Sequence, residues 1–478
     1  MAELWQLGAS KLAAEIRHRR VSSREVVESH LRRIDEVNPR VNAISVILAD
    51  QALQAADEAD RRLAAGESAG PLHGVPFTVK ENIDVAGTAT TSGVKGNEAK
   101  IAPVDAPAVS HLKTAGGIVL GRSNCPDFAF RWDTESGLYG RTLNPWHPQY
   151  TAGGSSGGEA AAVATGMSPL GVGTDFGGSL RWPAQCCGVL ALRSTLGRIP
   201  QAGSLEPVNP SLTRAMMSVN GPLARHTEDL RLALDVMSSP SPRDPWHVPA
   251  PLIGRPVTRP VRVAVVSRPG GLELHSEVAA AVRAAADALS DAGYAVEEAE
   301  PPDVAAAAAL WGQLVLADMR RVWPQMETVV TAGVKGFVTS LMTVIPSVDL
   351  AEYAAGFTAR NGIAREWSLF QDTYPVILGP VCTQPTFRVG EDLEGPERVR
   401  AMYESFSLKV AINVLGLPSI AVPARIVDRL PYGVQVIGSR YREDLCLEAA
   451  AAIESRLGVF TPIEPLDVAA GSKGDARS

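Results

Sequence analysis

The 478-residue chain is 45% hydrophobic and 20% charged, and it contains 43 glycines and 35 prolines. This composition is typical of a globular protein with a large core and excludes a disordered chain. The formal net charge of −7 gives no electrostatic reason to expect a nucleic-acid partner.

The first 65 residues are predicted to form an N-terminal helical arm. Ser22 and Glu25 form a capping-box pattern, and Val27, Leu31 and Ile34 then recur at helical spacing. From about residue 70 to 240, short β-type runs alternate with helix-type runs, which indicates an α/β layered sheet. The predicted strands are 75–79, 117–121, 170–174 and 189–192, and the predicted helices are 106–115, 157–166 and 227–237.

The proline-rich stretch 238–259 is predicted to be a surface connection. The predicted elements after it are strands at 261–266, 376–381, 419–422 and 433–437, and helices at 275–289 and 443–457. Residues 303–372 are predicted to be mostly helical, and we interpret them as a candidate mobile lid over the substrate. The α/β domain is expected to span 66–468, with a disordered tail at 469–478.

The cysteines and the apolar segments bear on compartment and cofactors. The five cysteines match neither a disulfide framework nor metal-binding spacing. No run of about 20 apolar residues occurs, and the amino terminus lacks an uninterrupted apolar core. We therefore expect a cytoplasmic protein that neither spans a membrane nor binds a metal.

Two serines lie in glycine-rich turns at either end of a helix-like stretch, between Thr151 and Arg181. At turns without Cβ atoms, backbone N–H groups can converge on a bound oxygen. Ser155 and Ser179 are therefore candidates for one acyl-transfer site. Ser155 also lies in a GxSxG match, but the segment before it is a loop, whereas a nucleophile elbow requires a strand.

Lys80 ends the apolar run 75–79 and is the candidate base, because none of the eight histidines lies in a motif that marks it as one. Burial disfavours the charged form of an amine and lowers its pKa, so a buried Lys80 could accept a proton near neutral pH. The alternative is a salt bridge between Lys80 and Glu81 or Asp84.

Taken together, the ordered motifs resemble the amidase signature family. The match extends roughly from residue 7 to 458 and is densest at 71–80, 121–124, 144–146 and 151–188, with later matches at 221–225, 416–423 and 430–435. The resemblance implies an α/β/α amidase-signature fold with a central mixed sheet flanked by helices. It also implies hydrolysis of a small-molecule carboxylic amide without a cofactor, with anilides, esters and carbamates as open alternatives, and a homodimer.

The resemblance also implies roles for single residues. Ser179 would be the nucleophile, Ser155 the bridging serine after a cis peptide bond, and Lys80 the terminal base. The oxyanion hole would consist of the backbone N–H groups of Phe176, Gly177, Gly178 and Ser179. Ser156 would hydrogen-bond Lys80, and Asp175 and Arg181 would brace the loop, the alternative being a plain surface ion pair. The residues expected to contact the substrate are Ala129, Phe130, Arg131 and Thr151.

The chain departs from the common family pattern at three places. The segment 191–195 reads ALRST where GLKPT is usual, Trp182 replaces a less bulky residue, and Cys186 and Cys187 precede Gly188. None of these departures removes a catalytic group. Two alternative functions stay open: the A subunit of a tRNA-dependent glutamine amidotransferase, and a non-catalytic binding protein on the same fold.

Overall fold

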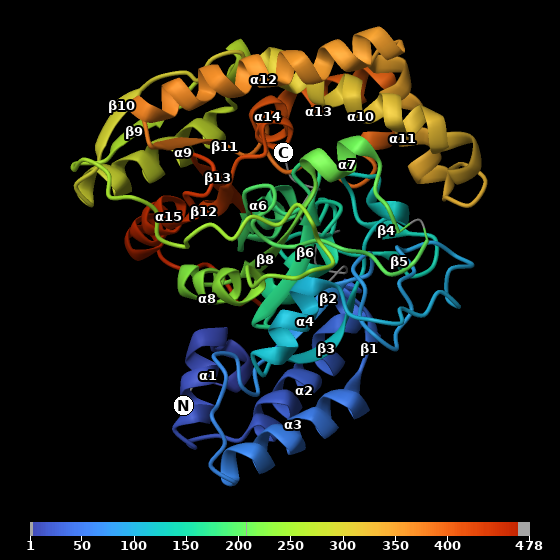
Figure 1. Ribbon diagram of the computed structural model, residues 1–478, viewed down its shortest axis with the longest axis vertical. Helices are drawn as coiled ribbons and strands as arrows, with labels where there is room; N and C mark the ends of the chain where they lie inside the picture. Colours follow the sequence, from blue (N-terminus) through green and yellow to red (C-terminus); the bar gives the residue numbers. More distant parts are fainter. Residues whose placement is uncertain (1–2, 207, 467–478) are drawn as a thin grey trace, which may run out of the picture.

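A mixed sheet of 11 strands forms the centre of the computed structural model, which describes residues 3–206 and 208–466. The strand order is β1-β3-β2-β6-β8-β7-β12-β13-β11-β9-β10, and helices flank both faces (Figure 1). The expected α/β class with a central mixed sheet is therefore confirmed. The tail predicted at 469–478 lies outside the described residues.

The N-terminal arm lies at one end of the molecule (Figure 1). Its helices are α1 (Ala9–Arg17), α2 (Ser23–Val41) and α3 (Ala49–Ala64), and α2 begins at the predicted capping box of Ser22 and Glu25. The segment also contains a strand that was not predicted, because β1 (Ile44–Ile47) pairs antiparallel with β3 at the sheet edge. Four residues between two helices are too few to show a strand period in the sequence.

The first half of the domain follows the predicted alternation and adds elements that the sequence did not reveal. The added elements are the strand β8 and the helices α6 and α7, with short strands β4 and β5. The strands are β2 (Pro76–Lys80), β3 (Ile118–Ser123), β4 (Glu135–Ser136), β5 (Gly140–Arg141), β6 (Leu170–Asp175), β7 (Leu190–Arg193) and β8 (Val219–Ala224). The helices are α4 (Pro107–Thr114), α5 (Gly157–Ala164), α6 (Arg181–Cys187), α7 (Leu212–Met217) and α8 (Thr227–Met237).

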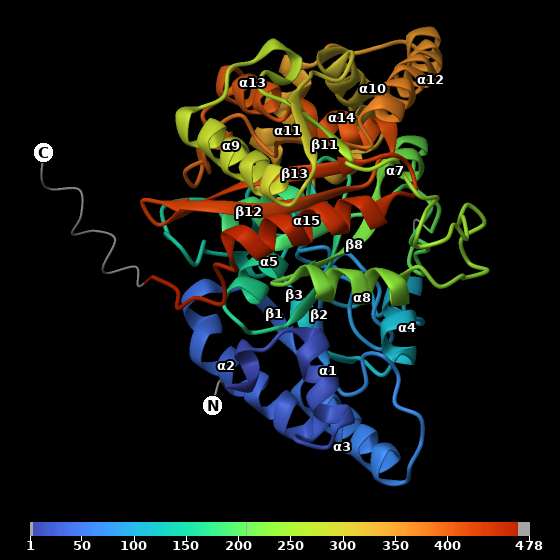
Figure 2. The same ribbon diagram turned by 90° about the vertical axis from the view of Figure 1, so that its left-hand side faces the viewer.

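The second half begins after the predicted connection. Its strands are β9 (Arg262–Val265), β10 (Ala295–Glu298), β11 (Val376–Pro380), β12 (Ser419–Val427) and β13 (Leu430–Gly438). Its helices are α9 (Ser276–Asp291), α10 (Val304–Met326), α11 (Ala332–Val344), α12 (Leu350–Thr373), α13 (Pro396–Ser405), α14 (Ser407–Leu415) and α15 (Glu443–Leu457). Helices α10 to α13 lie at the end of the molecule opposite the N-terminal arm (Figures 1 and 2).

The two faces of the sheet carry separate hydrophobic cores. Helices α4, α8, α9 and α15 pack on one face, where α8 and α15 lie side by side (Figure 2), and α5, α6, α10 and α14 belong to the other core. Side chains alternate between the faces of a strand. On β2, Phe77 and Val79 enter the first core, whereas the side chains of Thr78 and Lys80 contact residues of the α5 segment on the second face.

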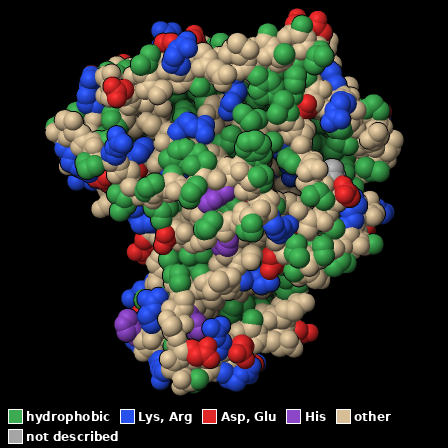
Figure 3. Space-filling model, in the orientation of Figure 1, with side chains coloured by type: hydrophobic (Ala, Val, Ile, Leu, Met, Phe, Trp, Pro, Cys, Tyr) green, Lys and Arg blue, Asp and Glu red, His purple; other side chains and the backbone are tan. Residues whose placement is uncertain are grey.

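Figure 3 shows one face of the molecular surface. Positive and negative side chains are interspersed over the face in Figure 3. Within the described ranges, every helix is too short or too polar to cross a bilayer.

Candidate active site

Lys80 lies at the centre of a buried network of hydroxyl groups. Its side chain is fully buried, and its Nζ lies 2.7 Å from Oγ of Ser155, 2.9 Å from Oγ of Ser156 and 3.0 Å from Oγ1 of Thr174. The fold therefore brings Lys80 next to Ser155 and Ser156, although the lysine precedes Ser155 by 75 residues in the chain. Thr174 completes the network and was not predicted.

The surroundings of Lys80 make its ammonium group easier to deprotonate than that of an exposed lysine. Burial lowers the pKa of Lys80 from 10.5 to about 8, although the charges of Cys125, Asp175 and Glu159 oppose this shift. The predicted alternative, a salt bridge to Glu81 or Asp84, was wrong, because among the described residues no carboxylate pairs with this amine. Hydroxyl partners stabilise an ammonium less than a carboxylate does, so the amine can accept a proton near neutral pH.

The turn that carries Ser155 lies directly before α5. The Gly154–Ser155 peptide bond is cis, as the family resemblance implied. Gly153 has a φ of +79°, and a Cβ atom there would lie 2.6 Å from Cα of Pro183, so the turn requires glycine at this position. The N–H of Ser156 donates to the carbonyl of Ser179 at 3.2 Å, and this bond joins the two serine turns.

Ser179 follows β6 and is half-buried beside this turn. Its hydroxyl makes no hydrogen bond to any residue that the structure describes. The structure therefore shows no hydrogen bond between the hydroxyls of Ser155 and Ser179, although the proton relay implied by the family resemblance requires one.

Glu159 is a second titratable group close to Lys80 that sequence reasoning missed. Its carboxylate accepts hydrogen bonds from Oγ1 of Thr78 at 2.6 Å and from Oγ of Ser123 at 2.8 Å. Thr78 shares β2 with Lys80, and Ser123 is paired with Lys80 across the sheet. Burial raises the pKa of Glu159 to about 7, although both hydroxyls oppose the shift. The contacts anchor α5, and with it Ser156, against the strand that carries the amine.

Asp175 is the centre of a buried charge cluster behind the Ser179 loop. Its carboxylate lies 3.1 Å from Nε of Arg181 and 3.3 Å from Nη1 of Arg193, and it accepts a bond from Nδ2 of Asn413 at 2.7 Å. All four side chains are fully buried. Burial alone would raise the pKa of Asp175, but the two guanidinium groups hold it well below its usual range.

The position of this cluster decides between two interpretations of Asp175 and Arg181. The alternative of a surface ion pair was wrong, because the pair is buried. Arg193 belongs to the segment that departs from the family pattern, and its role was missed. Arg193 lies two positions after Ala191 on β7, so its side chain points to the same face of the sheet as Ala191 and is buried there. This two-residue spacing could have shown from the sequence that Arg193 is a buried residue.

We expect Asp175→Asn to destabilise the protein by about 3–5 kcal/mol, because it leaves Arg181 and Arg193 buried with no counter-charge. Urea unfolding followed by circular dichroism measures the change in the free energy of unfolding. Asp57→Asn is the matched control, since Asp57 pairs with Arg24 on the surface at 2.8 Å. An equal loss in both variants would show that burial of the Asp175 cluster adds nothing.

The backbone N–H groups around Ser179 divide into two kinds. The N–H of Gly178 donates to Oδ1 of Asp175 at 2.9 Å, so it is turned into the protein. The N–H groups of Phe176, Gly177 and Ser179 have no acceptor among the described residues. The geometry thus favours three of the four predicted oxyanion donors and does not favour Gly178. This glycine has a φ of +92°, and a Cβ atom there would overlap the side chain of Lys409.

The residues predicted to contact the substrate fall into two groups. The Arg131 guanidinium is buried and pairs with Asp392 through Nε at 2.7 Å and with Glu135 through Nη1 at 2.7 Å. Oγ1 of Thr151 donates to Asp133 at 2.6 Å. These contacts hold the loop and do not favour substrate binding by Arg131 or Thr151. Ala129 and Phe130 are half-buried, and their role stays a prediction.

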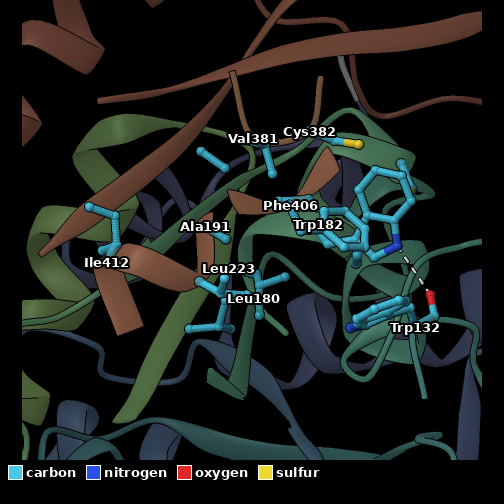
Figure 4. Packing of buried hydrophobic residues seen from close by; sticks show 14 of the residues in the cluster. Trp132, Leu180, Trp182, Ala191, Leu223, Val381, Cys382, Phe406 and Ile412 are labelled. Atoms are coloured by element: carbon cyan, nitrogen blue, oxygen red, sulfur yellow. Dashed lines mark hydrogen bonds between the residues drawn. The ribbon is translucent and has the colours of Figure 1, made fainter. Parts of the chain in front are cut away.

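Trp182 belongs to the core behind the site. It is fully buried on α6, its Nε1 donates to the carbonyl of Trp132 at 3.1 Å, and its ring contacts Phe406 (Figure 4). The bulky residue therefore fills the space between α6 and α14. In residues 3–206 and 208–466, no group of three or more His, Cys, Asp or Glu side chains is placed to hold a metal.

Comparison with known proteins shows which family the chain resembles. The sequence profile of the Amidase family matches residues 25–447. An indoleacetamide hydrolase of Bradyrhizobium diazoefficiens is 46% identical over 460 residues, which cover 96% of this chain and 88% of that protein. The A subunit of the glutamyl-tRNA(Gln) amidotransferase of Deinococcus radiodurans is 33% identical over 478 residues, which cover 94% of this chain and 96% of that protein.

A solved structure shows the same fold over nearly the whole chain. The 6-aminohexanoate cyclic dimer hydrolase, in complex with its substrate, matches with a TM-score of 0.81 and 29% identity. The match covers 95% of this chain and 98% of that one. The expected activity, hydrolysis of amide C–N bonds, is that of these relatives. The chain therefore belongs to the amidase signature family of amide hydrolases, as the order of its motifs implied.

Proposed function

We propose that the protein hydrolyses the primary amide of an arylacetic acid, such as indole-3-acetamide, to the carboxylic acid and ammonia. The observation that supports this chemistry is the buried Lys80 amine, which is hydrogen-bonded to the hydroxyl of Ser155 and to two further hydroxyls next to the Ser179 turn. The similarity to an indoleacetamide hydrolase over 96% of the chain supports the substrate class.

The reaction uses two serines and one lysine. Neutral Lys80 takes the proton of Ser155 as Ser155 takes the proton of Ser179, and Oγ of Ser179 attacks the amide carbon. The N–H groups of Phe176, Gly177 and Ser179 stabilise the tetrahedral oxyanion. The proton then returns through Ser155 to the leaving nitrogen, ammonia departs, and the acyl group stays on Ser179. Water, deprotonated through the same relay, attacks the acyl carbon. The bond from that carbon to Oγ of Ser179 breaks, the proton returns through Ser155 to Oγ of Ser179, and the carboxylic acid leaves and ionises in solution.

Aromatic side chains next to the nucleophile suit an aryl acyl group. Phe176 is half-buried three residues before Ser179, and its ring centroid lies 6.1 Å from that of Trp311 in an edge-to-face arrangement. A further ring adds a contact of the kind that is worth about 0.5–1.5 kcal/mol beyond its buried area. An aliphatic chain does not make this contact.

We expect kcat/KM for indole-3-acetamide and phenylacetamide to exceed that for hexanamide by about two- to tenfold, because each aryl ring adds a packing contact with the aromatic side chains next to Ser179. Ammonia release with the purified enzyme measures the rates. Equal rates for aryl and aliphatic amides would contradict the proposed substrate class. Hydrolysis of glutamine only with a second subunit would favour the amidotransferase alternative.

The non-catalytic alternative has its own outcome in the same assay. A protein that releases no ammonia from any amide, and that a sulfonyl fluoride does not label, would be a binding protein on this fold. The homodimer, the cytoplasmic location and the mobile lid at 303–372 stay predictions. Equal rates for small and bulky amides after removal of that segment would contradict the lid.

A further inference from the structure

A tryptophan from the helical layer reaches the backbone of the nucleophile loop. Trp311 on α10 is 6% exposed, and its Nε1 donates to the carbonyl of Phe176 at 2.9 Å. Its residue number places it more than 130 positions after Phe176, outside the segment that holds the serines. It also lies outside every motif on which the family resemblance rests.

The geometry of a peptide unit transmits this contact to the reaction centre. A trans peptide is planar, and its carbonyl and its N–H point to opposite sides. The carbonyl of Phe176 and the N–H of Gly177 belong to one such plane. A donor that holds the carbonyl therefore also sets the direction of the N–H, which has no acceptor among the described residues.

The other two N–H groups of the loop without an acceptor among the described residues, those of Phe176 and Ser179, also belong to peptide units whose carbonyl accepts a hydrogen bond. The carbonyl of Asp175 accepts a bond from Nη1 of Arg193 at 2.7 Å, and its plane carries the N–H of Phe176. The carbonyl of Gly178 accepts a bond from the N–H of Trp182 at 2.8 Å, and its plane carries the N–H of Ser179. Each free N–H thus lies opposite a carbonyl that is held.

Packing leaves the indole little freedom. A Cβ atom at Gly177 would lie 2.6 Å from Cζ2 of Trp311, so the ring lies directly against the glycine backbone. The ring centroid of Tyr403 lies 6.1 Å from that of Trp311, and the Tyr403 hydroxyl donates a hydrogen bond to the carbonyl of Ala308 on α10. The indole ring of Trp311 therefore fixes the position of α10 relative to the loop that carries Ser179.

We propose that Trp311 is a positioning residue of the oxyanion hole. Its indole N–H holds the Phe176–Gly177 peptide with the Gly177 N–H directed at the oxyanion of the tetrahedral intermediate. The inference rests on the proposed role of Ser179 as nucleophile. It also means that the oxyanion hole is built jointly by the serine segment and by α10.

The test removes the indole N–H and keeps the ring. Trp311→Phe is expected to lower kcat for an arylacetamide by about 10–100-fold, because a misdirected donor loses part of the effect of an oxyanion-hole hydrogen bond. KM should change by less than about threefold, since the amide oxygen carries little charge in the ground state. The matched control is Trp367→Phe. The Trp367 Nε1 donates to the carbonyl of Pro302 at 2.6 Å from α12, and its loss should leave kcat unchanged.

A transition-state mimic separates positioning from a purely structural role. An arylmethylboronic acid forms a tetrahedral adduct with a serine and places an oxygen in the oxyanion hole. Its inhibition constant should rise in Trp311→Phe by the same factor as kcat/KM falls, and should not rise in Trp367→Phe. Equal losses in the two variants, or an unchanged inhibition constant in Trp311→Phe, would overturn the inference.

A second substitution covers the case in which Trp311→Phe does not fold. Benzothienylalanine at position 311 keeps both rings and replaces the N–H by sulfur, so it should reproduce the loss of kcat in a protein with unchanged thermal stability. A wild-type kcat in that protein would overturn the inference. Absence of amide hydrolysis in the wild-type enzyme would instead overturn the proposed function.

Discussion

Ser179→Ala is expected to lower kcat for amide hydrolysis by about 10⁴-fold or more, the size of effect seen when a serine nucleophile is removed. The variant keeps the Lys80 network and the backbone donors but has no atom that can form the acyl intermediate. Its stability should be unchanged, because the Ser179 hydroxyl bonds to no residue that the structure describes. Ammonia release measures the rate, and thermal unfolding measures the stability.

Covalent labelling identifies the attacking serine directly. Phenylmethylsulfonyl fluoride should modify the wild-type enzyme at Ser179, located by peptide mass spectrometry, and should not modify Ser179→Ala. Ser290→Ala is the control, since Ser290 is exposed on α9 and should affect neither rate nor labelling. Labelling of Ser155 in the wild-type protein would reverse the roles assigned to the two serines.

Lys80→Met is expected to lower kcat by about 10²–10⁴-fold, the usual contribution of a general base. Methionine is unbranched and apolar, so it suits the buried site, but it leaves the hydroxyls of Ser155, Ser156 and Thr174 without their common partner. Lys335→Met on α11 is the control, because Lys335 is exposed and its ammonium group pairs with Glu327 on the surface.

The pH dependence of kcat/KM gives the sign of the lysine's role. A base must be unprotonated, so activity should rise with pH and level off above the pKa of Lys80, which burial lowers to about 8. At pH 7 about a tenth of such an amine is neutral, compared with well under a thousandth for an ordinary lysine. This rise should be lost in Lys80→Met. If the variant keeps it, another group such as Glu159 sets the pH dependence.

Sequence patterns predicted an element correctly where the pattern lies within one continuous segment. The capping box of Ser22 and Glu25 does begin α2, and helices α8 and α15 have the predicted bounds. The apolar run before Lys80 is a buried strand, because five consecutive apolar or β-branched residues suit a strand covered on both faces. Strand β1 was missed because its short pattern gains its meaning only from pairing with β3.

The site shows the same division. Glycine turns and a lysine at a strand end were visible in the chain, and with the family resemblance they led to Lys80, Ser155 and Ser179. By itself, the sequence indicated the α/β fold class, because the strand and helix patterns lie within short segments of neighbouring residues. The resemblance of its motifs to the amidase signature family implied the reaction class and the residues proposed for the relay. Only the tertiary structure decided that Gly178 turns its N–H inward and that Trp311 reaches the loop, because hydrogen-bond partners depend on distances between segments that are remote in the chain.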